Sequence, residues 1–222
     1  MNHACSGFRT RVKICGFTRP ADARAAALLG VDAIGLVFHE PSPRHVTVGQ
    51  ACAITAALPP FVTVVGLFVN ADPAHIREIT TRVRLDLIQF HGDESPAMCE
   101  AVGLPYIKAV AVRADRDWQA DLAGHDQARG FLLDAWHPDA RGGTGHRFDW
   151  NLIPAGLAGA CILAGGLTAE TVGLALETVR PYALDVSSGV EAGKGIKDAA
   201  RMAAFLNEVS TFDYRKTTTP TL

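Results

Sequence analysis

Two reactive side chains stand at the ends of short apolar runs. Cys15 closes the run RVKIC and is followed by Gly16, and Asp134 interrupts the apolar run FLLDAW. A lone cysteine is often core filler, and an aspartate can cap a turn. A buried carboxylate, however, is costly unless it is paired or functional. A thiol and a carboxyl group that face each other suit proton transfer, so the pair suggests an isomerisation such as an aldose-to-ketose shift.

Further polar residues lie at similar positions. Arg44 lies in HEPSPRHV, His91 closes LIQFH, and Asp185 lies in ALDVSSG. Each also has an ordinary interpretation: Arg44 as a solvated loop residue, for example, or His91 as the partner of a backbone group. Their common placement at the ends of apolar runs is what indicates a site.

Glycines and serines follow the last three apolar runs. Glycine lets a backbone approach an anion closely with its N–H groups turned inward. The candidate phosphate-binding residues are Gly143, Gly165, Gly166, Ser187, Ser188 and Gly189. GVEAGKG is not a P-loop, because only three residues separate its first two glycines and Gly195 stands where Ser or Thr is needed. The sequence therefore predicts a sugar phosphate rather than a nucleoside triphosphate as ligand.

Eight apolar or β-branched runs recur along the chain and predict strands. Several are apolar almost throughout, which is typical of strands buried on both faces of a parallel sheet. They cover residues 11–16, 33–38, 62–69, 87–92, 106–112, 130–136, 160–166 and 183–189. Strands that alternate with helices form βαβ units. Eight units predict an α/β fold, a single-domain (β/α)8 TIM barrel, rather than a flavodoxin-like or Rossmann sheet of five or six strands.

Capping signals mark the intervening helices. Asp72 and Ser95 each precede a proline at a first helical position, and Gly30 ends an alanine-rich helix. Thr168 caps a further helix, and 197–209 is the last amphipathic one. The sixth unit is the weakest, with only a short helix expected near 149–153. In such a barrel the site lies at the carboxyl ends of the strands. The candidate site residues, which follow the apolar runs, are therefore expected to meet there.

Bulk properties restrict partners and compartment. The net charge of −2 argues against a nucleic-acid or membrane-surface protein. No apolar run reaches the roughly 20 residues that span a bilayer, and the start carries no secretory signal. The five cysteines form no CxxC pair or zinc spacing, which predicts free thiols in a cytoplasmic protein without a metal. Residues 1–10 are predicted to be an N-terminal extension, 11–209 the catalytic barrel, and 210–222 a disordered tail.

A set of motifs resembles one enzyme family over residues 11–209. In chain order they are KICG (13–16), SPRHV (42–46), QFHG (89–92), LLDAW (132–136), GGTG with Phe148 after it (142–148), LAGGL (163–167) and DVSSGVE (185–191). Together they are similar to phosphoribosylanthranilate isomerase of tryptophan biosynthesis. KICG and DVSSGVE are the most specific, whereas LAGGL is shared by related phosphate-binding barrels. Phe90 departs from the leucine that is more usual in the fourth-strand motif.

The resemblance implies a reaction and a role for each matching residue. The reaction is the Amadori rearrangement of N-(5-phosphoribosyl)anthranilate to 1-(2-carboxyphenylamino)-1-deoxyribulose 5-phosphate, without cofactor or metal. Asp134 would be the general acid on the ribose ring oxygen, and Cys15 the general base on the C2 proton. Arg44 would meet the anthranilate carboxylate, Asp185 the sugar hydroxyls, and His91 would line the site. The family further implies a monomer.

Two alternatives stay open. One is a histidine-pathway or dual-specificity isomerase, which performs the same chemistry on a substrate with two phosphates. Such barrels use an aspartate where this chain has Cys15, and the stretch FVNADP lacks a glycine pair for a second phosphate. The other is a non-catalytic barrel that binds a sugar phosphate; the presence of both Cys15 and Asp134 argues against it.

Overall fold

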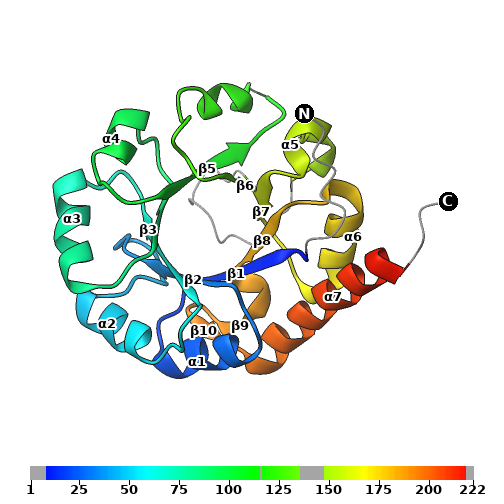
Figure 1. Cartoon of the computed structure of the whole chain (residues 1–222), viewed down its shortest axis with the longest axis horizontal. Helices are drawn as coiled ribbons and strands as arrows, with labels where there is room; N and C mark the ends of the chain where they lie inside the picture. Colours follow the sequence, from blue (N-terminus) through cyan, green and yellow to red (C-terminus); the bar gives the residue numbers. More distant parts are fainter. Residues whose placement is uncertain (1–8, 116, 136–147, 219–222) are drawn as a thin grey trace.

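The computed structural model describes residues 9–115, 117–135 and 148–218. Eight parallel strands pair in chain order, and β1 also pairs with β8, so the sheet closes into a barrel (Figure 1). The strands are β1 Arg11–Cys15, β2 Ala33–Val37, β3 Thr63–Phe68, β4 Leu87–Phe90, β5 Tyr106–Val112, β6 Phe131–Ala135, β7 Cys161–Leu163 and β8 Ala183–Val186. The predicted (β/α)8 barrel is confirmed, and each strand lies within its predicted run.

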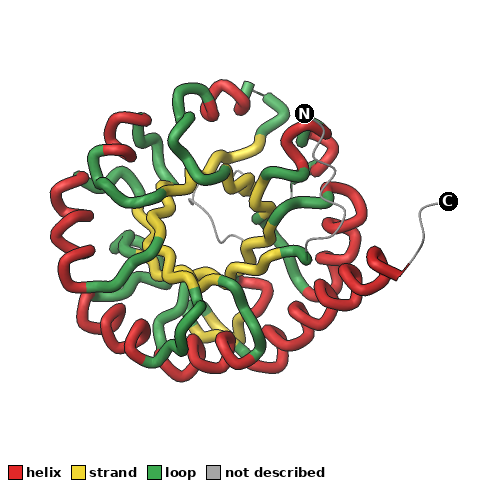
Figure 2. Tube along the Cα trace, viewed as in Figure 1, coloured by secondary structure: helices red, strands yellow, loops and turns green. Residues whose placement is uncertain are grey.

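Helices surround the barrel as an outer ring (Figure 2). The α-helices are α1 Pro20–Leu28, α2 Val48–Ala56, α3 Pro73–Arg82, α4 Pro96–Glu100, α5 Ala155–Ala158, α6 Ala169–Val179 and α7 Ala199–Thr218. Short 3-10 turns add η1 Trp118–Leu122, η2 Trp150–Leu152 and η3 Ser188–Val190. The Asp72 carboxylate and the Ser95 hydroxyl cap α3 and α4 by accepting backbone N–H groups, as predicted. In the weak sixth unit, the described residues between β6 and β7 form only η2 and the one-turn α5.

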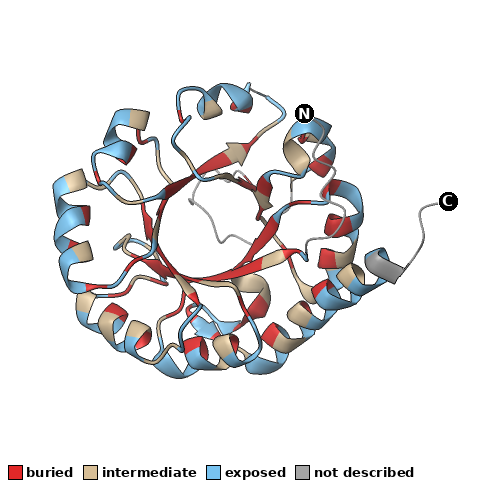
Figure 3. Ribbon diagram, in the orientation of Figure 1, coloured by how far each residue is buried: buried red, intermediate tan, exposed pale blue. Residues whose placement is uncertain are grey.

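Successive residues of each strand point to opposite faces, so the barrel wall carries two cores. One face packs against the helices and includes Ile14, Leu133 and Leu184 in a large apolar cluster. The other face fills the barrel interior, partly with a small apolar cluster that includes Ile107 and Leu132. The strands are buried almost throughout, whereas the helices alternate between buried and exposed faces (Figure 3). Side chains that point inward near the strand ends therefore line a protected site.

The carboxyl-terminal segment differs from the predicted disordered tail. Residues 210–218 continue α7 up to Thr218, while 219–222 lie outside the described residues. The Asp213 carboxylate accepts hydrogen bonds from the backbone N–H and the hydroxyl of Thr10, at 2.6 and 2.9 Å. Phe212 packs against the main core. These contacts tie the last helix to the residue before β1, which polar composition alone does not reveal.

A small hairpin follows β8 and was not predicted. Its strands, β9 Glu191–Gly193 and β10 Ile196–Lys197, pair antiparallel beside the barrel. The predicted helix over 197–209 therefore begins only at Ala199. None of the helices among the described residues is long and apolar enough to cross a membrane.

Candidate active site

Three strands contribute four polar side chains to the barrel interior. Lys13 and Cys15 alternate along β1, Asp134 follows Leu132 on β6, and Asp185 follows Ala183 on β8. All four polar residues are at least nine-tenths buried. Ile14, between Lys13 and Cys15, packs outward in the helix-facing core. The period of two in the strands thus explains why Lys13 and Cys15 share the interior.

Two glycines leave room for the side chains of Cys15 and Arg44. Cys15 lies beside Gly35 in the β1–β2 register, and a β-carbon built on Gly35 would lie 2.6 Å from Cys15 Sγ. Gly16 has φ of +84°, and a β-carbon there would collide with the Arg44 side chain. Gly16 therefore ends the strand in a left-handed conformation and lets Arg44 cross over it.

The thiol of Cys15 lies in a buried and strongly charged environment. Burial raises the pKa of Cys15, and the nearby Asp185 carboxylate acts in the same direction. The ammonium groups of Lys13 and Lys197 oppose this rise but do not outweigh it. The electropositive surroundings expected for a basic thiol are present, but burial and Asp185 together outweigh them and raise the pKa of Cys15.

Asp185 and Lys13 form a buried ion pair across the β8–β1 ladder. Lys13 Nζ donates to Asp185 Oδ1 at 2.9 Å, and the two residues are direct register partners. Burial raises the pKa of Asp185, Lys13 counteracts the rise, and the Asp134 carboxylate adds to it. The Asp185 carboxylate therefore interacts electrostatically with both the Cys15 thiol and the Asp134 carboxyl group.

Asp134 is held by two contacts at the end of β6. Its Oδ1 accepts from the backbone N–H of Ala135 at 2.8 Å, and its Oδ2 lies 3.4 Å from His91 Nε2. His91 Nδ1 in turn lies 2.9 Å from Gln89 Nε2. With the amide nitrogen as donor, the imidazole carries its proton on Nε2 and directs it at Asp134. The structure thus brings His91 to Asp134, and it adds Gln89, which the sequence did not single out.

Arg44 binds a carboxylate of the protein itself. Its Nε and Nη2 donate to the two Glu191 oxygens, each at 2.8 Å, in a bidentate pair. Lys197 Nζ donates to Glu191 Oε1 at 2.8 Å from the facing strand of the hairpin. Sequence reasoning missed Glu191 and Lys197 as site residues. Glu191 was visible as the last letter of DVSSGVE, but only the hairpin places Lys197 opposite it.

The loops after β7 and β8 lie against each other where a phosphate is expected. Gly165 and Gly166 both have positive φ, and a β-carbon on Gly189 would collide with the Leu167 carbonyl oxygen. Ser187 and Ser188 begin the turn that follows β8. The Ser187 hydroxyl donates to the Cys15 carbonyl at 3.0 Å, so its proton is used within the protein. Gly143, the remaining phosphate candidate, lies outside the described residues.

Gly165 also packs against Asp134. A β-carbon there would lie 2.8 Å from the Ala135 backbone nitrogen and 3.2 Å from Asp134 Oδ1. Among the described residues, no cluster of three or more histidine, cysteine, aspartate or glutamate side chains could hold a metal ion. The buried Cys15 thiol and Asp134 carboxyl group are side chains that can exchange protons with a bound molecule.

Comparison with known proteins points to one family. A family model described as N-(5'phosphoribosyl)anthranilate (PRA) isomerase matches residues 12–208. The N-(5'-phosphoribosyl)anthranilate isomerase of Azotobacter vinelandii (strain DJ / ATCC BAA-1303) is 57% identical over 199 residues, which cover 90% of this chain and 97% of the relative.

Solved structures agree with this match. Phosphoribosyl anthranilate isomerase from Thermotoga maritima is 38% identical, with a TM-score of 0.82 and coverage of 91% of this chain and 99% of that one. A phosphoribosyl anthranilate isomerase in complex with reduced 1-(o-carboxyphenylamino)-1-deoxyribulose 5-phosphate has a TM-score of 0.77 at 36% identity, with the same coverage. The chain belongs to the N-(5'-phosphoribosyl)anthranilate isomerase family.

Proposed function

We propose that Asp134 is the general acid and Cys15 the general base with which this chain performs the isomerase reaction of its family. The reaction is the Amadori rearrangement of N-(5-phosphoribosyl)anthranilate to 1-(2-carboxyphenylamino)-1-deoxyribulose 5-phosphate, a step of tryptophan biosynthesis. The observation that carries the assignment of roles is that both side chains occupy interior positions near the carboxyl ends of β1 and β6. That end of a TIM barrel is where catalytic residues lie.

The rearrangement needs one proton given and one taken. Protonated Asp134 donates to the ribose ring oxygen, the bond from that oxygen to C1 breaks, and the anthranilate nitrogen supplies the electrons for a Schiff base. The Cys15 thiolate then removes the proton from C2, which gives an enolamine. Tautomerisation of the enolamine to the ketone yields the product. His91, whose Nε2 lies 3.4 Å from Asp134, orients the acid and lines the site.

Three parts of the site match the carboxylate, the sugar hydroxyls and the phosphate of the substrate. Arg44 receives the anthranilate carboxylate, since guanidinium groups bind carboxylates through paired hydrogen bonds. Asp185, held by Lys13 at 2.9 Å, contacts the sugar hydroxyls. The backbone near Gly166, Ser188 and Gly189, together with Gly143, holds the phosphate, and Gly165 and Ser187 shape that loop pair. Close approach of the β7 and β8 loops supports this part of the proposal.

The proposed machinery comes from one chain. The proposed site residues within the described part lie in one barrel, which supports a site built by a single chain. We therefore propose a monomer that acts in the cytoplasm on a small soluble substrate. Light scattering during gel filtration tests the monomer directly, and a mass of twice 23.6 kDa would contradict it.

The reaction can be tested with substrate made in place. Anthranilate and phosphoribosyl pyrophosphate give phosphoribosylanthranilate, whose fluorescence is lost on isomerisation. Wild-type protein should give rapid decay, and Cys15→Ala and Asp134→Asn should give almost none while keeping the same circular dichroism spectrum. Folded variants with wild-type turnover would show that the acid and base lie elsewhere.

A further inference from the structure

Glu191 is the centre of a buried charge cluster that the acid–base mechanism does not use. Its side chain is 5% exposed, and it binds Arg44 through both oxygens and Lys197 through Oε1. The Lys197 side chain is fully buried, and its ammonium group lies 5.7 Å from the centre of the Phe17 ring. Two cations thus share one carboxylate, each in a fixed position.

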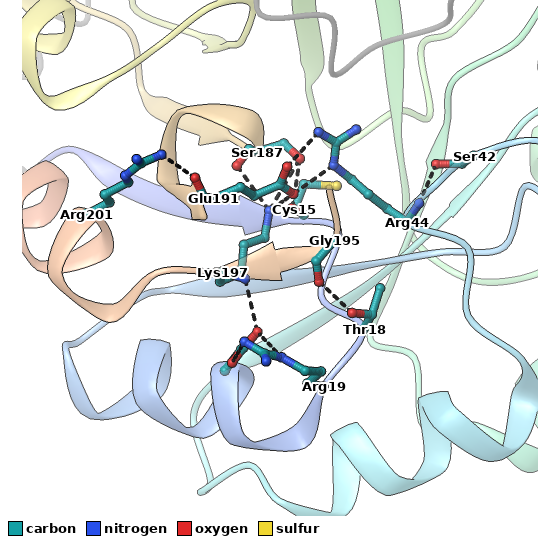
Figure 4. A network of polar contacts seen from close by, with 11 residues as sticks. Cys15, Thr18, Arg19, Ser42, Arg44, Ser187, Glu191, Gly195, Lys197 and Arg201 are labelled. Carbon is teal, nitrogen blue, oxygen red and sulfur yellow. Dashed lines mark hydrogen bonds and ion pairs between the residues drawn. The ribbon is translucent and has the colours of Figure 1, made fainter. Parts of the chain in front are cut away.

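A chain of hydrogen bonds leads from this cluster to the catalytic strand (Figure 4). Lys197 Nζ donates to the Ser187 carbonyl at 3.1 Å and lies 3.4 Å from the Ser187 hydroxyl. That hydroxyl donates to the carbonyl of Cys15 at 3.0 Å. The residue proposed to bind the anthranilate carboxylate and the residue proposed as base therefore belong to one continuous network.

The hairpin is held in place by hydrogen bonds to three neighbouring segments of the chain. The backbone N–H of Lys197 donates to Asp22 Oδ2 at 3.0 Å, and the Gly195 carbonyl accepts from the Thr18 hydroxyl at 2.5 Å. Arg201 of α7 donates to the Glu191 carbonyl. Glu191 and Lys197 are thereby held by the loop after β1, by α1 and by α7 (Figure 4).

We propose that Glu191 and Lys197 are positioning residues for the isomerase reaction. Glu191 fixes Arg44 by the Nε–Nη2 edge of its guanidinium, and the substrate carboxylate binds the outer Nη1–Nη2 edge through the remaining N–H groups. Lys197 pairs with the Glu191 carboxylate, adds positive charge near the Cys15 thiol, and holds the Cys15 backbone through Ser187. This inference rests on the proposed roles of Arg44 and Cys15 and assigns the residues that hold both in place.

The charges around Glu191 favour its ionised form. Burial acts to raise the pKa of Glu191, but Arg44 and Lys197 together lower it below its ordinary value. An ionised carboxylate keeps both guanidinium hydrogen bonds. Without Glu191, Arg44 would be free to rotate, and binding of the substrate would have to supply the ordering of its side chain.

Four charged groups act on the Cys15 thiol, and they come from four different elements. Lys13 lies on its own strand, Asp185 on β8, Lys197 on β10, and Arg44 in the loop after β2. Lys197 is one of the two cations that lower the pKa of Cys15 against burial. Removing the Lys197 charge should therefore make the thiolate harder to form.

The first experiment measures the thiol without substrate. Alkylation of Cys15 by iodoacetamide is followed against pH by mass spectrometry of the peptide that contains it. In Lys197→Gln the midpoint should move to higher pH by about one unit, and Lys197→Arg should restore it. Lys194→Gln, which removes an exposed charge from the same hairpin, is the matched control and should leave the midpoint unchanged.

The outcomes separate this inference from the proposed reaction. An unchanged midpoint in folded Lys197→Gln overturns the role of Lys197, whatever the turnover. Lys197→Met, which keeps an aliphatic chain over Phe17, serves if the glutamine variant does not fold. Because alkylation needs no substrate, a failed turnover assay does not affect this result.

The second experiment measures how strongly the enzyme binds its substrate. Glu191→Gln loses one of the two charge-assisted bonds to Arg44, so KM should rise by ~10-fold while kcat changes by less than ~3-fold. Glu208→Gln, at an exposed position of α7, is the control and should match wild type. Glu191→Asp, which keeps the charge but shortens the reach, is the second variant and should also raise KM. A fall in kcat with unchanged KM in both variants overturns the positioning of Arg44.

Discussion

A β-carbon at Gly35 would lie only 2.6 Å from the sulfur of Cys15. The two residues are register partners of β2 and β1, and the same β-carbon would lie 3.0 Å from the Cys15 α-carbon. The position of the thiol in the barrel therefore depends on the absence of a side chain on the neighbouring strand. Gly35 shapes the site as directly as the residues that carry its chemistry.

Gly35→Ala should lower kcat by about 10-fold or more. The added methyl group must displace the thiol or its strand, and displacement of a catalytic group by about 1 Å costs on the order of 10²-fold in rate. Steady-state kinetics with a thermal melt measure the effect. Gly173→Ala in α6 is the control, because its β-carbon would meet no atom within 4 Å, and it should keep wild-type activity. An active Gly35→Ala enzyme would show that the thiol position tolerates movement.

The barrel and the interior position of Cys15 were predictable because they depend on local patterns. Apolar runs fix the strands, and the period of two puts Cys15 and Lys13 on one face. Glu191 and Lys197 were not predictable as a pair, because a hairpin outside the repeated strand–helix pattern brings them together. The helical end of α7 was missed for a similar reason, since its Asp213 is satisfied by Thr10, 203 residues away.

Removal of either proton-transfer group should reduce turnover strongly. We expect Cys15→Ala and Asp134→Asn each to lower kcat by ~10²-fold or more, the range of general acid–base contributions. Cys99→Ala, at a buried cysteine of α4 away from the interior, is the control for loss of a thiol and should retain kcat. Single-turnover kinetics can separate the two steps. Wild-type kcat in either catalytic variant would refute the corresponding assignment.

The activity should depend on pH in the direction set by the thiol. Burial raises the pKa of Cys15, and a base must be deprotonated to act, so kcat/KM should increase as pH rises through the neutral range. The inflection should lie above the ordinary thiol value of about 8.5. A pH profile of kcat/KM for the free enzyme measures it. A profile that is flat from neutral to alkaline pH would contradict the thiolate as base.

Loss of the contact between α7 and the residue before β1 should affect stability more than activity. Asp213→Ala removes the acceptor for both the backbone N–H and the hydroxyl of Thr10, which is 9% exposed. A buried donor left without a partner costs ~1–3 kcal/mol, so the free energy of unfolding should fall by about this amount. Urea unfolding measures the loss, and Glu208→Ala, at an exposed position of the same helix, should change little. Because Thr10 precedes β1 at the end away from Cys15, kcat at 25 °C should stay within ~2-fold of wild type. Unchanged stability in Asp213→Ala would show that the carboxyl-terminal turns of α7 contribute nothing to the fold.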